Sequence, residues 1–463
     1  MTITEGAIDL AAAGSDEAPA LGKSLKARHI EMIAIGGIIG AGLFVGSSSA
    51  IATVGPAVII SYAIAGLIVL LVMRMLSEMA IAIPGVQSFP EFARLGLGHW
   101  AGFMSGWLYW YFWVVVVAIE AIAGASIIHL WLPMVETWAI GMVLMALLTG
   151  VNLLSTRSYG EFEFWFSSVK VAAILAFILV GGAYVAGLTA HAGPTLSNLT
   201  VHGGFMPNGA FAVLGGVTSV IFSLVGAEIA TIAAAESADS GQTVARMTAT
   251  VALRILIFYI LSITVVVAAL PWTSIVPGES PFAAVLAAIA IPGGATIMNL
   301  IVLVAVLSCL NSGLYVTSRV LFALAARGDA PQWLVVVDKR QVPGRSILVG
   351  SLFSYAALAA SVLSPQMVFA FLVNASGAIM LVIYLMIAAS QLRLRSQLER
   401  EASEPLTIRM WFHPWGGIFA IAGIVGVLLA MALTDSLTSQ FVASMAAVAV
   451  VGIAFLIFRR RAA

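Results

Sequence analysis

The sequence predicts an all-α, polytopic membrane protein with twelve transmembrane helices. Its 463 residues are 61% hydrophobic and only 9% charged, whereas soluble domains carry about 25% charged residues. Apolar runs of roughly 17–25 residues, the length that crosses a bilayer, recur along the whole chain. These runs are 30–50, 56–78, 101–130, 137–154, 162–187, 210–234, 248–270, 293–324, 346–363, 367–390, 415–433 and 439–458.

The basic residues predict how these helices are oriented. If residue 1 is cytoplasmic, every lysine and arginine except Lys170 falls in an inner segment, and the outer loops contain none. Positive charge accumulates in cytoplasmic loops, so we expect both termini inside. The predicted organisation is a cytoplasmic tail (1–28), a ten-span core (29–390), a cytoplasmic loop (391–414), two final spans (415–458) and a basic C-terminus (459–463).

Composition and motifs narrow the class of protein. The single cysteine, Cys309, allows no intramolecular disulfide, and the net charge of zero gives no sign of a nucleic-acid partner. We find no metal-ligand cluster, nucleotide-binding loop or nucleophile elbow, so we expect no cofactor, no metal and no enzymatic activity. Short loops without a soluble domain are typical of a transporter or channel in the lipid bilayer, with a membrane-embedded enzyme as the alternative. No obligate protein partner is evident.

Two of the predicted spans contain clusters of small residues. Span one reads "IAIGGIIGAGLFVG" (33–46), and span six reads "VLGGVTSVIFSLVGAEIATI" (213–232). They occupy equivalent places in two consecutive five-span halves, which must be inverted because five is odd. Glycine-interrupted helices at matching positions of inverted repeats point to the binding site of a transporter. The GxxxG spacings in span one also permit simple close packing of helices.

The stronger interpretation is that both helices are broken. Non-helical backbone survives at membrane depth only where it lines a cavity or is buried in protein. At the span-one break, near 38–42, the N–H groups of the second half-helix would face an anion such as a substrate carboxylate. At the span-six break, 222–226, exposed carbonyl groups would suit an ammonium group.

Three buried charges are candidates for a functional role. Lys170 lies about eight residues into span five, or ~12 Å from its end, too deep to reach water easily. It could carry a proton, replace a coupling cation, or form a static ion pair with Glu120 or Glu228. Glu228 and Glu120 lie inside spans six and three, where a carboxylate is costly and is therefore a functional hypothesis by default. Charges near the inner ends of spans one and two are interpreted as gate or boundary charges: Glu31, Arg74 and Glu78.

Aromatic and polar residues complete the candidate site. Span three contains "GWLYWYFW" (106–113), from which Trp110 or Trp113 could form the wall of a pocket. Span eight contains "SCLNSGLYVTSR" (308–319), in which a polar stripe includes Tyr315, a candidate substrate contact. The alternative for both segments is helix packing.

The chain resembles the amino acid permeases of the amino acid–polyamine–organocation superfamily. The span-one segment "RHIEMIAIGGIIGAGLFVGS" identifies the superfamily, and other segments resemble its bacterial γ-aminobutyrate (GABA) permease branch. The resemblance covers about 22–458. The segments that carry the branch-level likeness are "GWLYWYFWVVVVAIEA", "NLLSTRSYGEFEFW", "GGFMPNG", "GAEIATIAAAES", "SCLNSGLYVTSRVLFALAARGDAP" and "SGAIMLVIYLMIAASQLRLR".

This resemblance implies the five-plus-five inverted-repeat fold with two extra C-terminal spans, and proton-coupled uptake. It implies that the substrate carboxylate binds at Ile39, Gly40, Ala41 and Gly42, and that the amine binds near Phe222, Ser223 and Gly226. It places Lys170 where sodium binds in sodium-coupled relatives. Relatives often have a hydroxyl side chain near Ala41 or Gly42; here it is absent, so backbone N–H groups must serve.

The predicted function is therefore a proton-coupled secondary transporter in the inner membrane of a bacterium. Its expected substrate is GABA or a similar short ω-amino acid, taken up with H+ by alternating access. The alternatives are a permease or exchanger for another amino acid, such as lysine, an aromatic amino acid or β-alanine, then a channel or a membrane enzyme.

Overall fold

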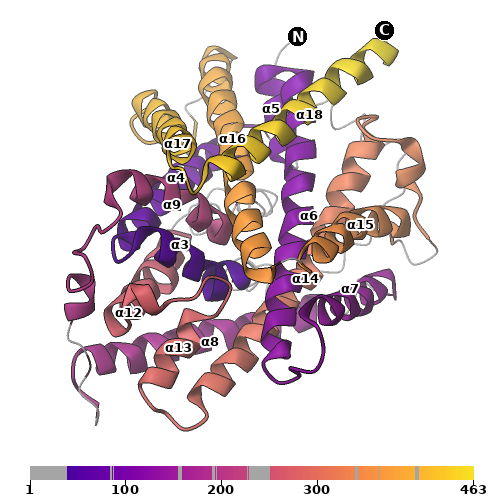
Figure 1. The fold of residues 1–463 in the computed structure, drawn as a ribbon. Coiled ribbons are helices and arrows are strands. Elements are labelled where there is room, and N and C mark those ends of the chain that lie inside the picture. The colour runs from indigo at the N-terminus through magenta and orange to yellow at the C-terminus, as the bar shows by residue number, and fades with distance from the viewer. Residues whose placement is uncertain are drawn as a thin grey trace.

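The computed structural model describes residues 39–83, 86, 88–154, 159–189, 193, 196–226, 228, 251–338, 342–362, 364–401 and 406–462. Regular structure within these ranges consists of helices, without a strand. The helices form one bundle, in which α6 runs through the middle with α16 beside it (Figure 1).

Within the part of the chain that the structure describes, eight helical segments are long and apolar enough to cross a membrane. Seven of them are α4 (Val58–Ala82), α6 (His99–His129), α8 (Tyr159–Val185), α14 (Gly294–Ala326), α16 (Pro365–Glu401), α17 (Trp415–Leu433) and α18 (Thr438–Ala462). The eighth, Val251–Ala269, contains the π-helix η4 (Ile255–Leu261) and α12 (Ser262–Ala269).

Four shorter apolar helical segments accompany these eight in the described ranges. They are η2 (Gly42–Gly46) continuing into α3 (Ser47–Val54), α7 (Thr137–Leu154), α9 (Gly209–Leu224) and α15 (Gly344–Ala360). The remaining short elements are α5 (Phe89–Leu97), η3 (Ser197–Leu199), η5 (Trp272–Ser274), α13 (Pro281–Ala288) and η6 (Gln332–Val335). All the predicted spans have a helix at the expected place, which confirms the all-α membrane class; the count of twelve stays a prediction.

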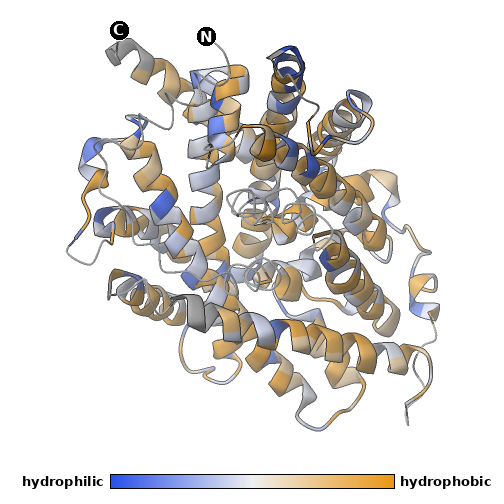
Figure 2. Ribbon diagram, turned by 180° about the vertical axis from the view of Figure 1, so that it is seen from behind, coloured by the Kyte–Doolittle hydropathy of each residue, from blue (hydrophilic) through white to orange (hydrophobic). Residues whose placement is uncertain are grey.

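The outer surface of the bundle is apolar. The membrane-length stretch of α18 is only 6% buried although its mean hydropathy is 2.7, and α7 and α8 expose large side chains such as Leu147 and Leu179. Figure 2 shows hydrophobic colour along most of the helices, with a marked hydrophilic segment at one end of the bundle. A large apolar surface of this kind is suited to lipid contact.

The most buried long helix is α6, and it positions the centre of the molecule. In its membrane-length stretch 83% of the residues are buried. It packs against α14, α16 and α5, while α4 and α16 both pack against α9. The break that precedes α3 lies against α6 and α14 at Gly40, and the end of α9 lines the same small cavity.

Two segments that the predicted topology places on the cytoplasmic side contain helices. The helix α16 continues to Glu401, through the first part of the loop predicted at 391–414, and carries an Arg395–Glu399 ion pair one turn apart, which supports a helix. The short helix α5 begins with Pro90 in its first turn. It is joined to the segment after α14 by the ion pairs Arg94–Asp329 and Glu91–Arg327.

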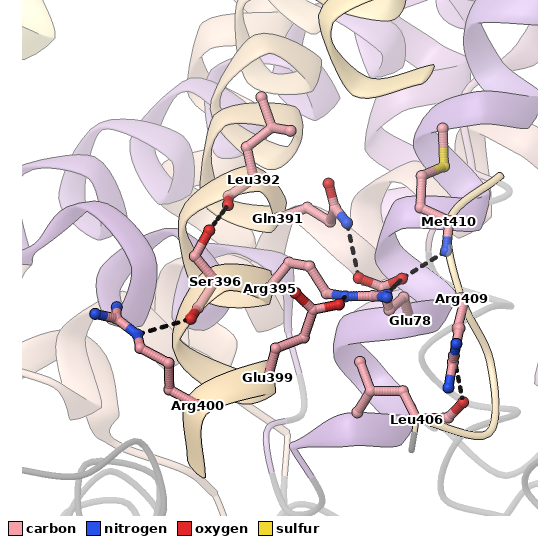
Figure 3. Close-up of polar contacts among 10 residues, drawn as sticks. All are labelled: Glu78, Gln391, Leu392, Arg395, Ser396, Glu399, Arg400, Leu406, Arg409 and Met410. Atoms are coloured by element: carbon pink, nitrogen blue, oxygen red, sulfur yellow. Dashed lines mark hydrogen bonds and ion pairs between the residues drawn. The ribbon is translucent and has the colours of Figure 1, made fainter. Parts of the chain in front are cut away.

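Glu78 ties α4 to α16 and to the segment before α17 (Figure 3). Its buried carboxylate accepts hydrogen bonds from Gln391 Nε2 at 2.7 Å, from Arg395 Nη1 and from the Met410 N–H. Arg74, one turn earlier in α4, donates to the Arg409 carbonyl and stacks over Trp411. The interpretation of Arg74 and Glu78 as boundary charges stays a prediction, and Glu31 lies outside the described residues.

Close packing of α9 on α16 depends on Gly377. A Cβ atom built on Gly377 would overlap the Thr218 carbonyl oxygen of α9, and one turn earlier Asn374 Oδ1 accepts hydrogen bonds from Thr218 and Ser219. We expect Gly377→Ala to push the helices apart and destabilise the protein by about 1–3 kcal/mol. The measurement is the midpoint of thermal unfolding in detergent.

The matched control for this prediction is Gly426→Ala on α17, where an added Cβ meets no atom within 4 Å. We expect this variant to unfold at the temperature of the unmodified protein or slightly above it. Equal midpoints for the two variants would contradict the importance of the close contact.

Candidate functional site

The first break is described from Ile39 onward; residues 1–38, which include Gly36 and Gly37, lie outside the described part. Ile39 and Gly40 are not helical, and the chain then enters the π-helix η2 and continues as α3. The Ala41 N–H donates to Glu120 of α6, with Oε1 at 3.1 Å and Oε2 at 3.0 Å. A carboxyl side chain of the protein therefore lies at the start of this half-helix. Binding of a substrate carboxylate at this break stays a prediction.

Gly40 lets the break approach α6 and α14 closely. A Cβ at this position would lie 2.6 Å from Glu120 Oε1 and 2.7 Å from Cys309 Cβ, well inside van der Waals contact. Any larger residue would have to displace the Glu120 carboxylate. The glycine is thus required by the fit of the carboxylate against the backbone.

The second break follows α9. The helix ends at Leu224, Val225 is extended, and Gly226 has a φ of +107°, a conformation that glycine adopts readily and other residues rarely. The Gly226 N–H donates to Glu228 Oε2 at 2.9 Å. Of the residues after Gly226 up to 250, only Glu228 is described.

The two breaks are in direct contact. A Cβ on Gly42 would lie 2.8 Å from the Ser223 Cα atom and 2.9 Å from its Cβ. Phe222 and Ser223 thus lie beside Gly42. The Ser223 carbonyl accepts a hydrogen bond from Tyr259 Oη at 2.8 Å and is one of the last carbonyls of α9, which have no partner within the helix.

A small cavity lies where the breaks meet α6 and α14. Its volume is about 20 Å³, room for about one water molecule, so an amino acid fits only if the lining side chains move. The lining residues are Gly42, Phe112, Trp113, Val116, Glu120, Phe222, Ser223, Val225 and Cys309. One wall is aromatic, and the only carboxylate in the lining is that of Glu120.

Lys170 is fully buried in α8, and its Nζ donates to Ser308 Oγ of α14 at 2.9 Å. The next residue, Cys309, contacts Glu120 through its thiol, and the Lys170 charge also acts on the Glu120 carboxylate through space. Lys170 and Glu120 are therefore connected by two consecutive residues of α14. A direct ion pair between them, one of the possibilities that the sequence left open, stays a prediction.

Glu228 has a different set of partners. Its carboxylate accepts from Tyr109 Oη at 3.2 Å in addition to the Gly226 N–H. The buried guanidinium of Arg254 provides the opposite charge. Arg254 is therefore a charged neighbour of Glu228 that the sequence analysis did not consider.

Of the residues predicted to bind substrate, Gly42, Phe222 and Ser223 line the cavity. The others are not in its lining: Ile39, Gly40, Ala41, Gly226, Trp110 and Tyr315. Trp110 packs in a separate apolar cluster with Val114 and Leu321. Tyr315 lies under the Arg319 guanidinium, whose carbon is 3.7 Å from the ring centroid. Trp113, the other candidate of span three, does line the cavity.

Several lining residues gave no signal in the sequence. Phe112, Val116 and Val225 are ordinary apolar residues of a membrane helix, and Cys309 was noted only for its bearing on disulfides. Arg254 could have been predicted from the sequence, because an arginine six residues inside a predicted span is a candidate buried charge.

Comparison with known proteins now assigns the family. The sequence profile of amino acid permeases matches residues 29–461. The chain belongs to the amino acid permease family. It is 49% identical to the gamma-aminobutyric acid permease of Bacillus subtilis, over 95% of this chain and 94% of that protein.

Two further relatives of the permease carry different substrate names. The gamma-aminobutyric acid permease of Escherichia coli is 46% identical over 89% of this chain and 88% of that protein. An aromatic amino acid transport protein of Corynebacterium glutamicum is 40% identical, over 92% and 93% of the two chains. The resemblance found in the sequence is confirmed, and the permease is a multi-pass bacterial inner-membrane protein that transports amino acids and is not an enzyme.

The contact of Gly40 with Glu120 gives a direct test of this site. We expect Gly40→Ala to abolish amino acid uptake, at least a 100-fold loss of initial rate, because the methyl group displaces the carboxylate from Ala41. The measurement is uptake of a radiolabelled amino acid by cells with matched membrane levels of the variant.

Gly150→Ala in α7 is the control, since an added Cβ there meets no atom within 4 Å. It should transport at the unmodified rate. Normal uptake by Gly40→Ala would show that the close fit at the break is unimportant.

Proposed function

We propose that the permease imports GABA or a similar short ω-amino acid together with H+, by alternating access across the inner membrane. The observation that carries this proposal is the juxtaposition of the two breaks at one cavity. On one side lies the Ala41 N–H, which binds a carboxylate, and on the other lie Ser223 and the end of α9. A zwitterion has the two charges that these poles match.

The similarity to proteins named as GABA permeases, at 46–49% identity, supports this substrate class. The cavity is too small for an amino acid as it stands. Binding therefore needs movement of the breaks, which alternating access would supply. We assign the carboxylate to Ile39, Gly40, Ala41 and Gly42, and the amine to the carbonyl groups around Phe222, Ser223 and Gly226.

We assign proton coupling to Lys170 and Glu120. Both are buried and connected through Ser308 and Cys309, so a change of charge on one is felt by the other in a medium of low dielectric constant. Glu228 is the weaker candidate for proton transfer because Arg254 and Tyr109 already compensate its charge.

The proposed topology keeps both termini cytoplasmic. The tail (1–28) precedes the inverted-repeat core (29–390), and the segment 391–414 leads to the final spans (415–458) and the basic C-terminus (459–463). This assignment is supported by the absence of lysine and arginine from the predicted outer loops.

An aromatic amino acid is the second candidate substrate. Phe112, Trp113 and Phe222 line the cavity, and an aromatic amino acid transport protein is 40% identical to this chain. Uptake of labelled GABA into proteoliposomes, with an imposed pH gradient and with unlabelled β-alanine, lysine or phenylalanine as competitors, separates the candidates. We expect GABA and β-alanine to compete and phenylalanine to have little effect.

The same experiment contains the test against a channel, because only a coupled transporter accumulates substrate above its external concentration when the inside is alkaline. Strong competition by phenylalanine alone would favour the aromatic substrate. Equilibration without accumulation would contradict proton coupling.

Replacing Lys170, whose ammonium group is buried, tests its assignment to proton coupling. We expect Lys170→Ala to abolish accumulation driven by a pH gradient, so that the internal concentration only reaches the external one. Exchange of labelled for unlabelled substrate should persist and serves as the control for correct folding. Normal accumulation by this variant would contradict the role of Lys170.

A further inference from the structure

At each of the two helix breaks, a buried glutamate accepts a hydrogen bond from a backbone N–H group. Glu120 accepts from the Ala41 N–H at the first break, and Glu228 accepts from the Gly226 N–H at the second. Both carboxylates are at most 1% exposed. Only Glu120 lines the cavity, so the two contacts have different consequences.

Glu120 accepts a hydrogen bond from the Ala41 N–H, which is the donor that the substrate carboxylate would use. Both of its oxygens are within 3.1 Å of the Ala41 nitrogen, and about 20 Å³ of space remains beside them. Two carboxylates cannot share one N–H donor in this volume, because like charges so close together repel strongly. Occupancy of this position by Glu120 and by the substrate is therefore mutually exclusive.

The other groups around Glu120 determine what happens when it leaves Ala41. From α14 the Cys309 thiol faces it, and from α8 the Lys170 ammonium acts on it across Ser308. Among the described residues of the first break, the Ala41 N–H donates to Glu120, and Gly40 packs against its carboxyl group. A carboxylate withdrawn from Ala41 thus loses its backbone donor, and a proton on Glu120 removes the cost of a poorly paired buried charge.

We propose that Glu120 is an internal ligand that occupies the position of the substrate carboxylate and gives it up on protonation. The inference rests on the proposed function for the location of the substrate carboxylate. The proton comes from the aqueous side to which the site is open and binds a Glu120 oxygen. The neutral carboxyl group is a weaker acceptor than a carboxylate, so the substrate carboxylate can replace it on the Ala41 N–H. On the other side the substrate leaves, the proton is released, and the carboxylate returns to Ala41.

The test is the pH dependence of substrate binding by purified protein, measured with the tightest-binding member of a labelled panel of GABA, β-alanine, lysine and phenylalanine. In the unmodified permease, affinity should fall up to tenfold per pH unit as pH rises through the range in which Glu120 ionises. In Glu120→Gln the neutral amide cannot be ionised, so affinity should be independent of pH across that range.

Two variants complete the design. Glu136→Gln changes an exposed glutamate far from the site and should keep the unmodified pH slope. Glu120→Asp retains a carboxylate, so its substrate affinity should still fall as pH rises. This variant keeps the inference testable if Glu120→Gln does not fold. Proton-driven accumulation should be lost in Glu120→Gln while exchange persists.

The outcomes separate this inference from the proposed substrate. If another amino acid of the panel binds tightest, GABA is wrong as the substrate, and loss of the slope in Glu120→Gln still supports the internal ligand. A slope that Glu120→Gln retains, or binding by the unmodified protein that does not change with pH, would overturn it. A uniform loss of affinity at every pH would indicate a purely structural role for Glu120 and would overturn it as well.

Discussion

A helix broken inside a membrane must find partners for its backbone, and here the Glu120 carboxylate provides one for Ala41. Water is absent from the hydrocarbon core, so an unpaired N–H there is costly. Gly40 makes the contact possible because it has no side chain between the backbone and α6. The position of the first break against α6 and α14, and hence the cavity itself, depends on this hydrogen bond.

The buried charges divide into two groups with different surroundings. Glu228 is held by Gly226, Tyr109 and Arg254, away from the cavity lining. Glu120 faces the cavity and is connected to Lys170 through α14. A carboxyl group with backbone, hydroxyl and guanidinium partners of its own stabilises a structure, whereas one that shares its donor with a ligand can respond to that ligand. Under the proposed function, this difference makes the first break the place where substrate and proton can meet.

Much of this arrangement could be predicted from residue types and their depth in the membrane. The glycines of span one, the small residues near Gly226, and the buried Lys170 and Glu120 were all visible as features that an ordinary spanning helix does not need. Partners were harder to predict, because Glu120 and Ala41 are 79 residues apart and nothing in the sequence gives the relative rotation of α6. That helix is buried on almost all sides, so hydrophobic periodicity could not distinguish Trp110 from Trp113.

The central claim is that one backbone donor serves Glu120 and the substrate in turn. An experimental structure of the permease with its substrate bound at acidic pH tests it most directly. We expect the substrate carboxylate within about 3 Å of the Ala41 nitrogen, with the Glu120 carboxyl group displaced toward Cys309 or Lys170. A bound substrate together with an unchanged Glu120 contact to Ala41 would contradict the claim.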